Sequence, residues 1–189
     1  MLGSTYTARE VRRLASERGV KGVVVTAGMT ASAGSDVRID VRHPPPGLVP
    51  GTAPTSNDNS VVLKVTMGSV SFLLTGDIEE RGLSWLLRDP KALRSTVLKV
   101  PHHGSRLGEA GARVFHAVHP QLAVLSVGRL HHLPAPDTLH ALEETGAALY
   151  TTRDDGAIAL RTDGTCVDVR TFKHPVRVKP VGPSFGSCT

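Results

Sequence analysis

Two apolar segments of this chain end in residues that can bind a metal ion. The segment SVSFLLTGDIEE at residues 69–80 carries Asp77 directly after a Thr-Gly pair, and STVLKVPHHGSRLGE at residues 95–109 carries His102 and His103 directly after a proline. Carboxylate oxygen and imidazole nitrogen together suit hard and borderline divalent ions. Because one helical pattern separates the two segments, we expect Asp77 and the two histidines at neighbouring ends of parallel strands.

Each of these signals also has an ordinary explanation when it is taken alone. Asp77 would make a good N-cap for the helix that follows it, and adjacent histidines occur on surface loops. Adjacent side chains point in different directions, so we expect one of His102 and His103 to ligate an ion and the other to contact or orient substrate. Two ligands fall short of the three protein ligands that catalytic ions normally have.

Composition excludes several classes of protein. The 189 residues are 40% hydrophobic and 21% charged, which argues for a packed core and against disorder over most of the length. The net charge of +5 permits phosphate-rich partners but identifies none. The two cysteines, Cys166 and Cys188, form no CxxC pair, so a zinc ribbon or a disulfide framework is not expected.

The same residues bear on localisation. No apolar run approaches the roughly 18 residues of a membrane span, and no apolar stretch follows the N-terminal arginines as it would in a signal peptide. We expect a cytoplasmic location, or a membrane association through a missing N-terminal part.

Hydrophobic periodicity predicts a mixed sheet covered by helices, an α/β (α+β) class. Residues 44–59 are a loop by composition, and residues 61–66 and 70–74 form a hairpin. We expect one domain over residues 1–172 and an irregular tail over residues 173–189. Helices are predicted over 7–18, 78–88, 110–119 and 136–145, and further strands over 21–26, 37–41, 97–100, 122–127, 149–152, 157–161 and 167–170.

Four segments, taken in order, resemble the metallo-β-lactamase-like domain of the ComEC competence family. They are SNDNSVVLKVTMGSVSFLLTGDIEE, VLKVPHHGSR, HPQLAVLSVGR and PAPDTLHALEETGAALYTTRDDGAIALRTDG. The resemblance covers about residues 40–165. It implies an αββα sandwich and a hydrolase that depends on divalent metal, Mn or Zn. It also implies an Asp after a Thr-Gly turn that bridges two ions, which matches Asp77, and a His on the next strand end, which matches His102 or His103.

The resemblance also implies partners. The ComEC protein is a bacterial DNA-uptake channel, and this domain is thought to act there as a nuclease on incoming DNA. Single- or double-stranded DNA is therefore the expected substrate, and the membrane channel portion of that family is an expected partner. Within such a site Ser105 or His102 would contact the phosphate, and Arg106 would neutralise its charge.

The sequence departs from the family pattern at two places. The first ligand cluster of the family, His-x-Asp-x-Asp-His, does not start at any of the nine histidines. The chain therefore resembles the second half of the domain and lacks its N-terminal half. A Gly-His-Pro that the family tends to carry is replaced by His131-His132-Leu133-Pro134, so we assign no metal role to His132.

The loop before the hairpin keeps Asn57-Asp58-Asn59-Ser60 where other members of the superfamily place a His ligand. Asn59 is a candidate site residue and Asp58 a weaker one. Ordinary turn chemistry explains both residues equally well.

Three functions follow from these observations. The first is a phosphodiesterase or nuclease acting on DNA during uptake, impaired in this chain because the first ligand cluster is missing. The second is a non-catalytic remnant or structural half-domain that needs a partner and exposes an apolar face, which favours self-association. The third is a generic acyl hydrolase of the metallo-β-lactamase fold.

Overall fold

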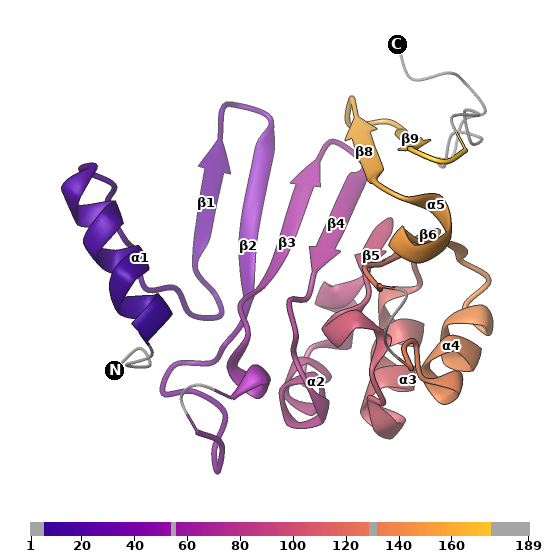
Figure 1. Ribbon diagram of the computed structural model, residues 1–189, viewed down its shortest axis with the longest axis horizontal. Helices are drawn as coiled ribbons and strands as arrows, with labels where there is room; N and C mark the ends of the chain where they lie inside the picture. Colours follow the sequence, from indigo (N-terminus) through magenta and orange to yellow (C-terminus); the bar gives the residue numbers. More distant parts are fainter. Residues whose placement is uncertain (1–5, 54–55, 129–131, 175–189) are drawn as a thin grey trace.

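A seven-stranded mixed sheet organises the computed structural model, which describes residues 6–53, 56–128 and 132–174 (Figure 1). Its spatial order follows the sequence, with antiparallel pairing from β1 to β4 and parallel pairing from β4 to β7. The carboxyl ends of β4 to β7 therefore meet at one edge. The strands are β1 (Thr30–Ala33), β2 (Val37–His43), β3 (Val62–Met67), β4 (Val70–Leu74), β5 (Val97–Lys99), β6 (Leu122–Leu125) and β7 (Ala148–Thr151).

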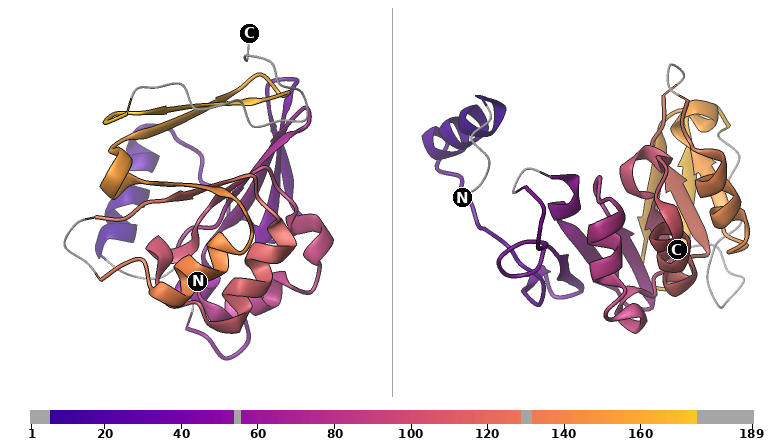
Figure 2. Two further views of the ribbon diagram at one scale, coloured as in Figure 1. Left: turned by 90° about the vertical axis from the view of Figure 1, so that its right-hand side faces the viewer. Right: turned by 90° about the horizontal axis from the view of Figure 1, so that it is seen from below.

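Helices follow the strands of the parallel half and cover one face of the sheet (Figure 2). The α-helices are α1 (Tyr6–Glu17), α2 (Glu80–Leu86), α3 (Gly108–Val118), α4 (Pro136–Glu143) and the short α5 (Thr152–Asp155). Single 3₁₀ turns lie at Asn57–Asn59, Pro90–Leu93 and Pro101–Gly104. Of the longer helices, α1 lies apart from the others, beyond β1 (Figure 1), and its Val11 is 60% exposed.

The central strands are buried on both faces, as their runs of Val and Leu require. Leu98 and Ala123 point into a core shared with α2, α3 and α4, and their neighbours Val97 and Leu122 point into a second core on the opposite face. The second core is closed by a two-stranded antiparallel sheet of β8 (Ile158–Thr162) and β9 (Val167–Thr171). Helices, sheet and second sheet thus form three layers (Figure 2), and the predicted α/β class is confirmed.

The second sheet has two strands in the part of the chain that the structure describes. Leu63 and Val65 of β3 lie on the same face of the large sheet as the second core, but both are only half-buried. Leu74 at the end of β4 is 41% exposed. This face of the large sheet is therefore less completely covered over β3 and the end of β4, and self-association through it stays a prediction.

The strand predicted over residues 21–26 is wrong. Residues 20–26 form no strand, and Val23 and Val24 are 64% and 66% exposed. A run of β-branched residues becomes a strand only when a neighbour supplies hydrogen bonds. Here Thr30–Ala33 pairs with β2 through a tight turn instead. The tail predicted from residue 173 falls mostly outside the described residues, because the structure describes the chain only as far as residue 174.

Helix α2 packs against the 3₁₀ turn that precedes β3, and this contact depends on a glycine. The backbone N–H of Gly82 donates to Asp58 Oδ1 at 2.9 Å. A Cβ at this position would lie 2.6 Å from Ile78 Cγ1 and 2.7 Å from the Asp58 backbone oxygen. Real Cβ atoms do not approach so closely, so a larger residue must push the turn and the helix apart.

We predict that Gly82→Ala lowers the free energy of unfolding by about 1–3 kcal/mol, since overpacking at a backbone contact outweighs the higher helix propensity of alanine. Urea denaturation measures the change. Ser84→Ala, on the exposed side of the same helix, is the matched control and should stay within about 0.5 kcal/mol of the parent. An unchanged or raised midpoint for Gly82→Ala would contradict the packing described here.

Candidate functional site

The turn after β4 is tied to the end of β5. The buried Thr75 hydroxyl donates to the Lys99 carbonyl at 2.6 Å, and the His102 N–H donates to the Gly76 carbonyl at 3.2 Å. Gly76 has φ +58°, and a Cβ on it would lie 3.3 Å from Ser60 Cβ. A left-handed backbone in a crowded position explains the glycine between Thr75 and Asp77. This turn places Asp77 beside the two histidines.

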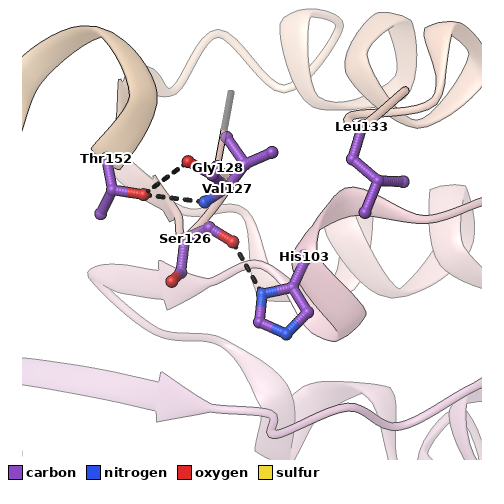
Figure 3. A pocket seen from close by; sticks show the side chains of 6 residues that line it. All are labelled: His103, Ser126, Val127, Gly128, Leu133 and Thr152. Carbon is purple, nitrogen blue, oxygen red and sulfur yellow. Dashed lines mark hydrogen bonds between the residues drawn. The ribbon is translucent and has the colours of Figure 1, made fainter. Parts of the chain in front are cut away.

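His103 is the histidine that faces Asp77. Its Nε2 lies 3.6 Å from Asp77 Oδ1, and both side chains are 47% exposed. Its Nδ1 lies 2.7 Å from the carbonyl oxygen of Ser126, which follows β6 (Figure 3). A carbonyl only accepts, so Nδ1 carries a hydrogen, and in the neutral imidazole Nε2 then keeps its lone pair toward Asp77. An imidazole held by its other nitrogen is the usual arrangement for a metal ligand, so this pair fits a divalent ion.

The two histidines occupy an unusual backbone conformation. His102 has φ 44° and His103 has φ 55°, both in the left-handed region, within the turn Pro101–Gly104. Non-glycine residues in this region cost of the order of 1 kcal/mol or more each, and they cluster at functional sites. The strained turn directs the two side chains to different partners, as their adjacency in the sequence predicts.

His102 faces Glu79 rather than Asp77. Its Nδ1 is buried and lies 3.1 Å from Glu79 Oε1, although the two groups are not aligned for a hydrogen bond. Asn57 Nδ2 donates to the same Glu79 oxygen at 3.1 Å. Sequence reasoning missed Glu79 and Asn57. The signal for Glu79 was its position two residues after Asp77, in the same TGDIEE segment.

Glu79 also rules out one of the two interpretations of Asp77, that of a helix cap. It occupies the N-cap position of α2, so Asp77 is not the helix cap that the alternative interpretation required. Lys99 adds a positive charge on β5, where its ammonium donates to the Val100 carbonyl at 2.8 Å. Burial lowers the pKa of Lys99, and the nearby Asp77 carboxylate partly opposes that effect.

Two of the predicted phosphate contacts follow the histidine turn. The Ser105 carbonyl accepts from the Thr138 hydroxyl at 2.7 Å, which ties this segment to α4. Arg106 is 80% exposed, and its Nε lies 3.4 Å from Asp137 Oδ2. Such an exposed ion pair is weak, so Arg106 can exchange Asp137 for a phosphate. Both roles stay predictions.

The two loop residues predicted beside the site, Asn59 and Asp58, have structural contacts with the 49–53 loop and with α2. The Asn59 carboxamide accepts from the Val49 N–H at 2.9 Å and donates to the Thr52 hydroxyl and the Ala53 carbonyl, each at 2.9 Å. Asp58 is buried against α2, as described above. Asn59 therefore holds the 49–53 loop in place, and its contact with substrate stays a prediction. His132 is exposed, whereas His131 lies outside the described residues.

Metal-ligand groups and membrane-spanning helices are both absent from the described residues. These residues contain no group of three or more His, Cys, Asp or Glu side chains placed to hold a metal ion. None of their helices has the length and apolar character needed to cross a membrane.

No family model matches this chain. It is 33% identical to ComE operon protein 3 of Bacillus subtilis (strain 168) over 110 residues, which are 57% of this chain and 14% of that protein. It is 34% identical to competence protein ComA of Neisseria gonorrhoeae over 108 residues, again 57% of this chain and 14% of that protein. The chain therefore spans only about a seventh of the length of the curated relatives it matches.

The chain carries part of a ComEC-like domain. Among solved structures, it is similar to a crystal structure from Parabacteroides distasonis ATCC 8503 that is described as a metal-dependent hydrolase. The TM-score is 0.44 at 14% identity, covering 72% of this chain and 60% of that chain. This likeness is too distant to assign a reaction.

The ComEC-like domain also has a histidine that sequence reasoning left without a role. His43 ends β2 at the same edge as Asp77 and is fully buried. Its Nδ1 lies 2.8 Å from the Ser60 carbonyl, its ring meets Trp85 edge-on with centroids 5.6 Å apart, and its buried Nε2 has no hydrogen-bond partner. Because Ser60 contacts the Gly76 turn, His43 supports the turn that carries Asp77.

We predict that the ComEC-like domain loses stability as the pH falls below about 6.5, the usual pKa of an unfolded histidine. Burial lowers the pKa of His43 in the folded state. Between the lowered folded pKa and 6.5 the unfolded chain therefore binds the extra proton, and protonation favours unfolding. Thermal or urea unfolding between pH 5 and 8 measures this dependence.

His43→Gln is the matched variant, since glutamine keeps a donor for the Ser60 carbonyl but does not titrate. It should be less stable at pH 8 and should show a flatter dependence below pH 6.5. A parent protein whose stability is constant from pH 8 to pH 5, or equal slopes for the two proteins, would show that His43 is not the group responsible.

Proposed function

We propose that the protein is a metal-dependent phosphodiesterase of the ComEC type that acts on DNA. The observation that carries this proposal is the Asp77–His103 pair, in which the Ser126 carbonyl fixes the imidazole and leaves Nε2 directed at a carboxylate 3.6 Å away. The similarity to competence proteins supports DNA as the substrate. A net charge of +5 is compatible with it.

In this function Asp77 and His103 would hold a divalent ion, manganese or zinc, across the ends of β4 and β5. When bound, such an ion supplies Lewis-acid polarisation of a phosphoryl oxygen and lowers the pKa of water. Other residues of the chain hold these two side chains in place. The Ser126 carbonyl fixes the ring of His103, and Thr75 and Gly76 fix the turn that carries Asp77. His102, which faces Glu79, is the group we assign to substrate, together with Ser105, Arg106 and Asn59.

We further propose that these 189 residues have weak activity by themselves. Asp77 and His103 supply two ligands, fewer than the three that catalytic ions normally have. The remaining ligands would come from a His-x-Asp-x-Asp-His segment, as the resemblance implies. That segment, and the membrane channel portion of the same family, are the proposed partners, and an association with the membrane would follow from them.

Two other functions remain candidates. A non-catalytic half-domain is favoured by the lack of a three-ligand group among residues 6–53, 56–128 and 132–174. An acyl hydrolase is less favoured, because the similarity is to competence proteins.

The test uses a fusion in which a segment bearing His-x-Asp-x-Asp-His precedes Met1. We predict that the fusion cleaves DNA and bis-p-nitrophenyl phosphate with manganese, whereas the bare chain stays near background, because the fusion supplies the missing ligands. Asp77→Ala in the fusion should abolish cleavage. Among the described residues, Asp77 is the carboxylate that pairs with His103, and no other carboxylate does.

His140→Ala, on the exposed surface of α4, is the matched control and should leave cleavage unchanged. Turnover of thioesters or β-lactams without DNA cleavage would support the acyl hydrolase. A bare chain that cleaves DNA at a rate unaffected by Asp77→Ala would refute the assignment of Asp77.

A further inference from the structure

A cavity of about 470 Å³ opens beside the Asp77–His103 pair, on the side away from β4. Figure 3 shows Thr152 and Leu133 on opposite sides of it, with the imidazole of His103 between them. The volume falls within the range of about 300–1,000 Å³ that is typical of small-molecule sites. The lining residues are His103, Ser126, Val127, Gly128, Leu133 and Thr152.

Among the described residues that line the cavity, His103 is the one that can carry a charge. Among the described residues, no Lys, Arg, Asp or Glu side chain lines it. Val127 and Leu133 give it apolar walls, and the Ser126 hydroxyl makes no hydrogen bond to another described residue. An ionised group would find no oppositely charged Lys, Arg, Asp or Glu partner among these lining residues. The lining therefore suits an uncharged group with a few polar atoms at its edge.

Hydrogen bonds hold the walls in place. The Thr152 hydroxyl accepts from the Val127 N–H at 2.8 Å and lies 2.9 Å from the Val127 carbonyl, to which it donates. The Ser126 carbonyl accepts from His103, and Arg153 Nη1 donates to the Leu133 carbonyl at 3.2 Å. Each wall is thus anchored to a neighbouring element, so the cavity exists before any ligand enters.

We propose that this cavity binds the base of the nucleotide whose phosphate lies at Asp77 and His103. The proposal rests on the proposed function and adds to it where the uncharged part of the substrate goes. Enzymes that act on unstacked nucleotides hold the base between apolar side chains and hydrogen-bond its edge. Here Val127 and Leu133 would be the apolar side chains around the base, and the Ser126 hydroxyl would form the hydrogen bond to its edge. A base can enter only when it is unstacked, so the substrate would be single-stranded or locally opened DNA.

The test needs neither metal nor turnover, so it can fail independently of the proposed function. Thymidine is titrated into the 189-residue chain while backbone amide signals are followed by NMR. We expect the signals of Val127 and Thr152 to shift. Deoxyribose 5-phosphate, which has the phosphate but not the base, should leave them unchanged.

Two variants sharpen the result. Leu133→Trp fills the cavity and should weaken thymidine binding at least ten-fold, whereas Leu139→Trp, which does not line the cavity, should not. Ser126→Ala removes the free hydroxyl but keeps the carbonyl that holds His103. It should weaken binding about two- to ten-fold, as the loss of one hydrogen bond does, and it remains informative if Leu133→Trp does not fold.

The proposal is overturned if thymidine shifts neither amide, or if Leu133→Trp binds thymidine as tightly as the parent. It is also overturned if a hexanoyl thioester shifts these amides and thymidine does not, since the cavity would then be an acyl site. A thymidine response that Leu133→Trp removes would support the proposal even if the chain proved inactive on DNA.

Discussion

The hydrogen bond between His103 Nδ1 and the Ser126 carbonyl is the constraint on which the candidate site depends. It joins the end of β5 to the end of β6, fixes which imidazole nitrogen carries the hydrogen, and directs the other nitrogen toward Asp77. It also shapes the neighbouring cavity, because Ser126 and His103 both line it. Removal of this bond would free the ring to rotate and would disturb the Asp77–His103 pair and the cavity together, although neither Asp77 nor Leu133 had changed.

The sheet makes this bond possible. Parallel pairing of β4, β5 and β6 brings Thr75, Val100 and Ser126 to one edge, and the turn at Gly76 then places a carboxylate beside the imidazole. Buried groups next to this edge hold its turns in position. The Thr75 hydroxyl bonds across to β5, and His43 supports the Ser60 segment that contacts Gly76. The half-exposed Asp77–His103 pair is thus held by a surrounding structure that is mostly buried.

Spacing and residue type were enough to predict the α/β class and to place Asp77 beside the histidine pair. They could not say which histidine faces Asp77, because that choice follows from the left-handed backbone of His102 and His103. Glu79 was missed, since its contact with His102 depends on the folded turn. The strand predicted over residues 21–26 failed because a run of valines reports a preference for a strand but not the presence of a neighbour. His43 was also missed, because burial and an unpaired Nε2 are invisible in sequence.

Locating the ion itself would show directly whether Asp77 and His103 hold a metal. Crystals of the 189-residue chain grown or soaked with zinc or manganese would be measured at the absorption edge of the metal. We predict an anomalous peak within coordination distance of the Asp77 carboxylate and His103 Nε2, and its loss in His103→Gln. A peak elsewhere, such as at the His140–Glu144 pair on α4, with none between Asp77 and His103, would contradict it.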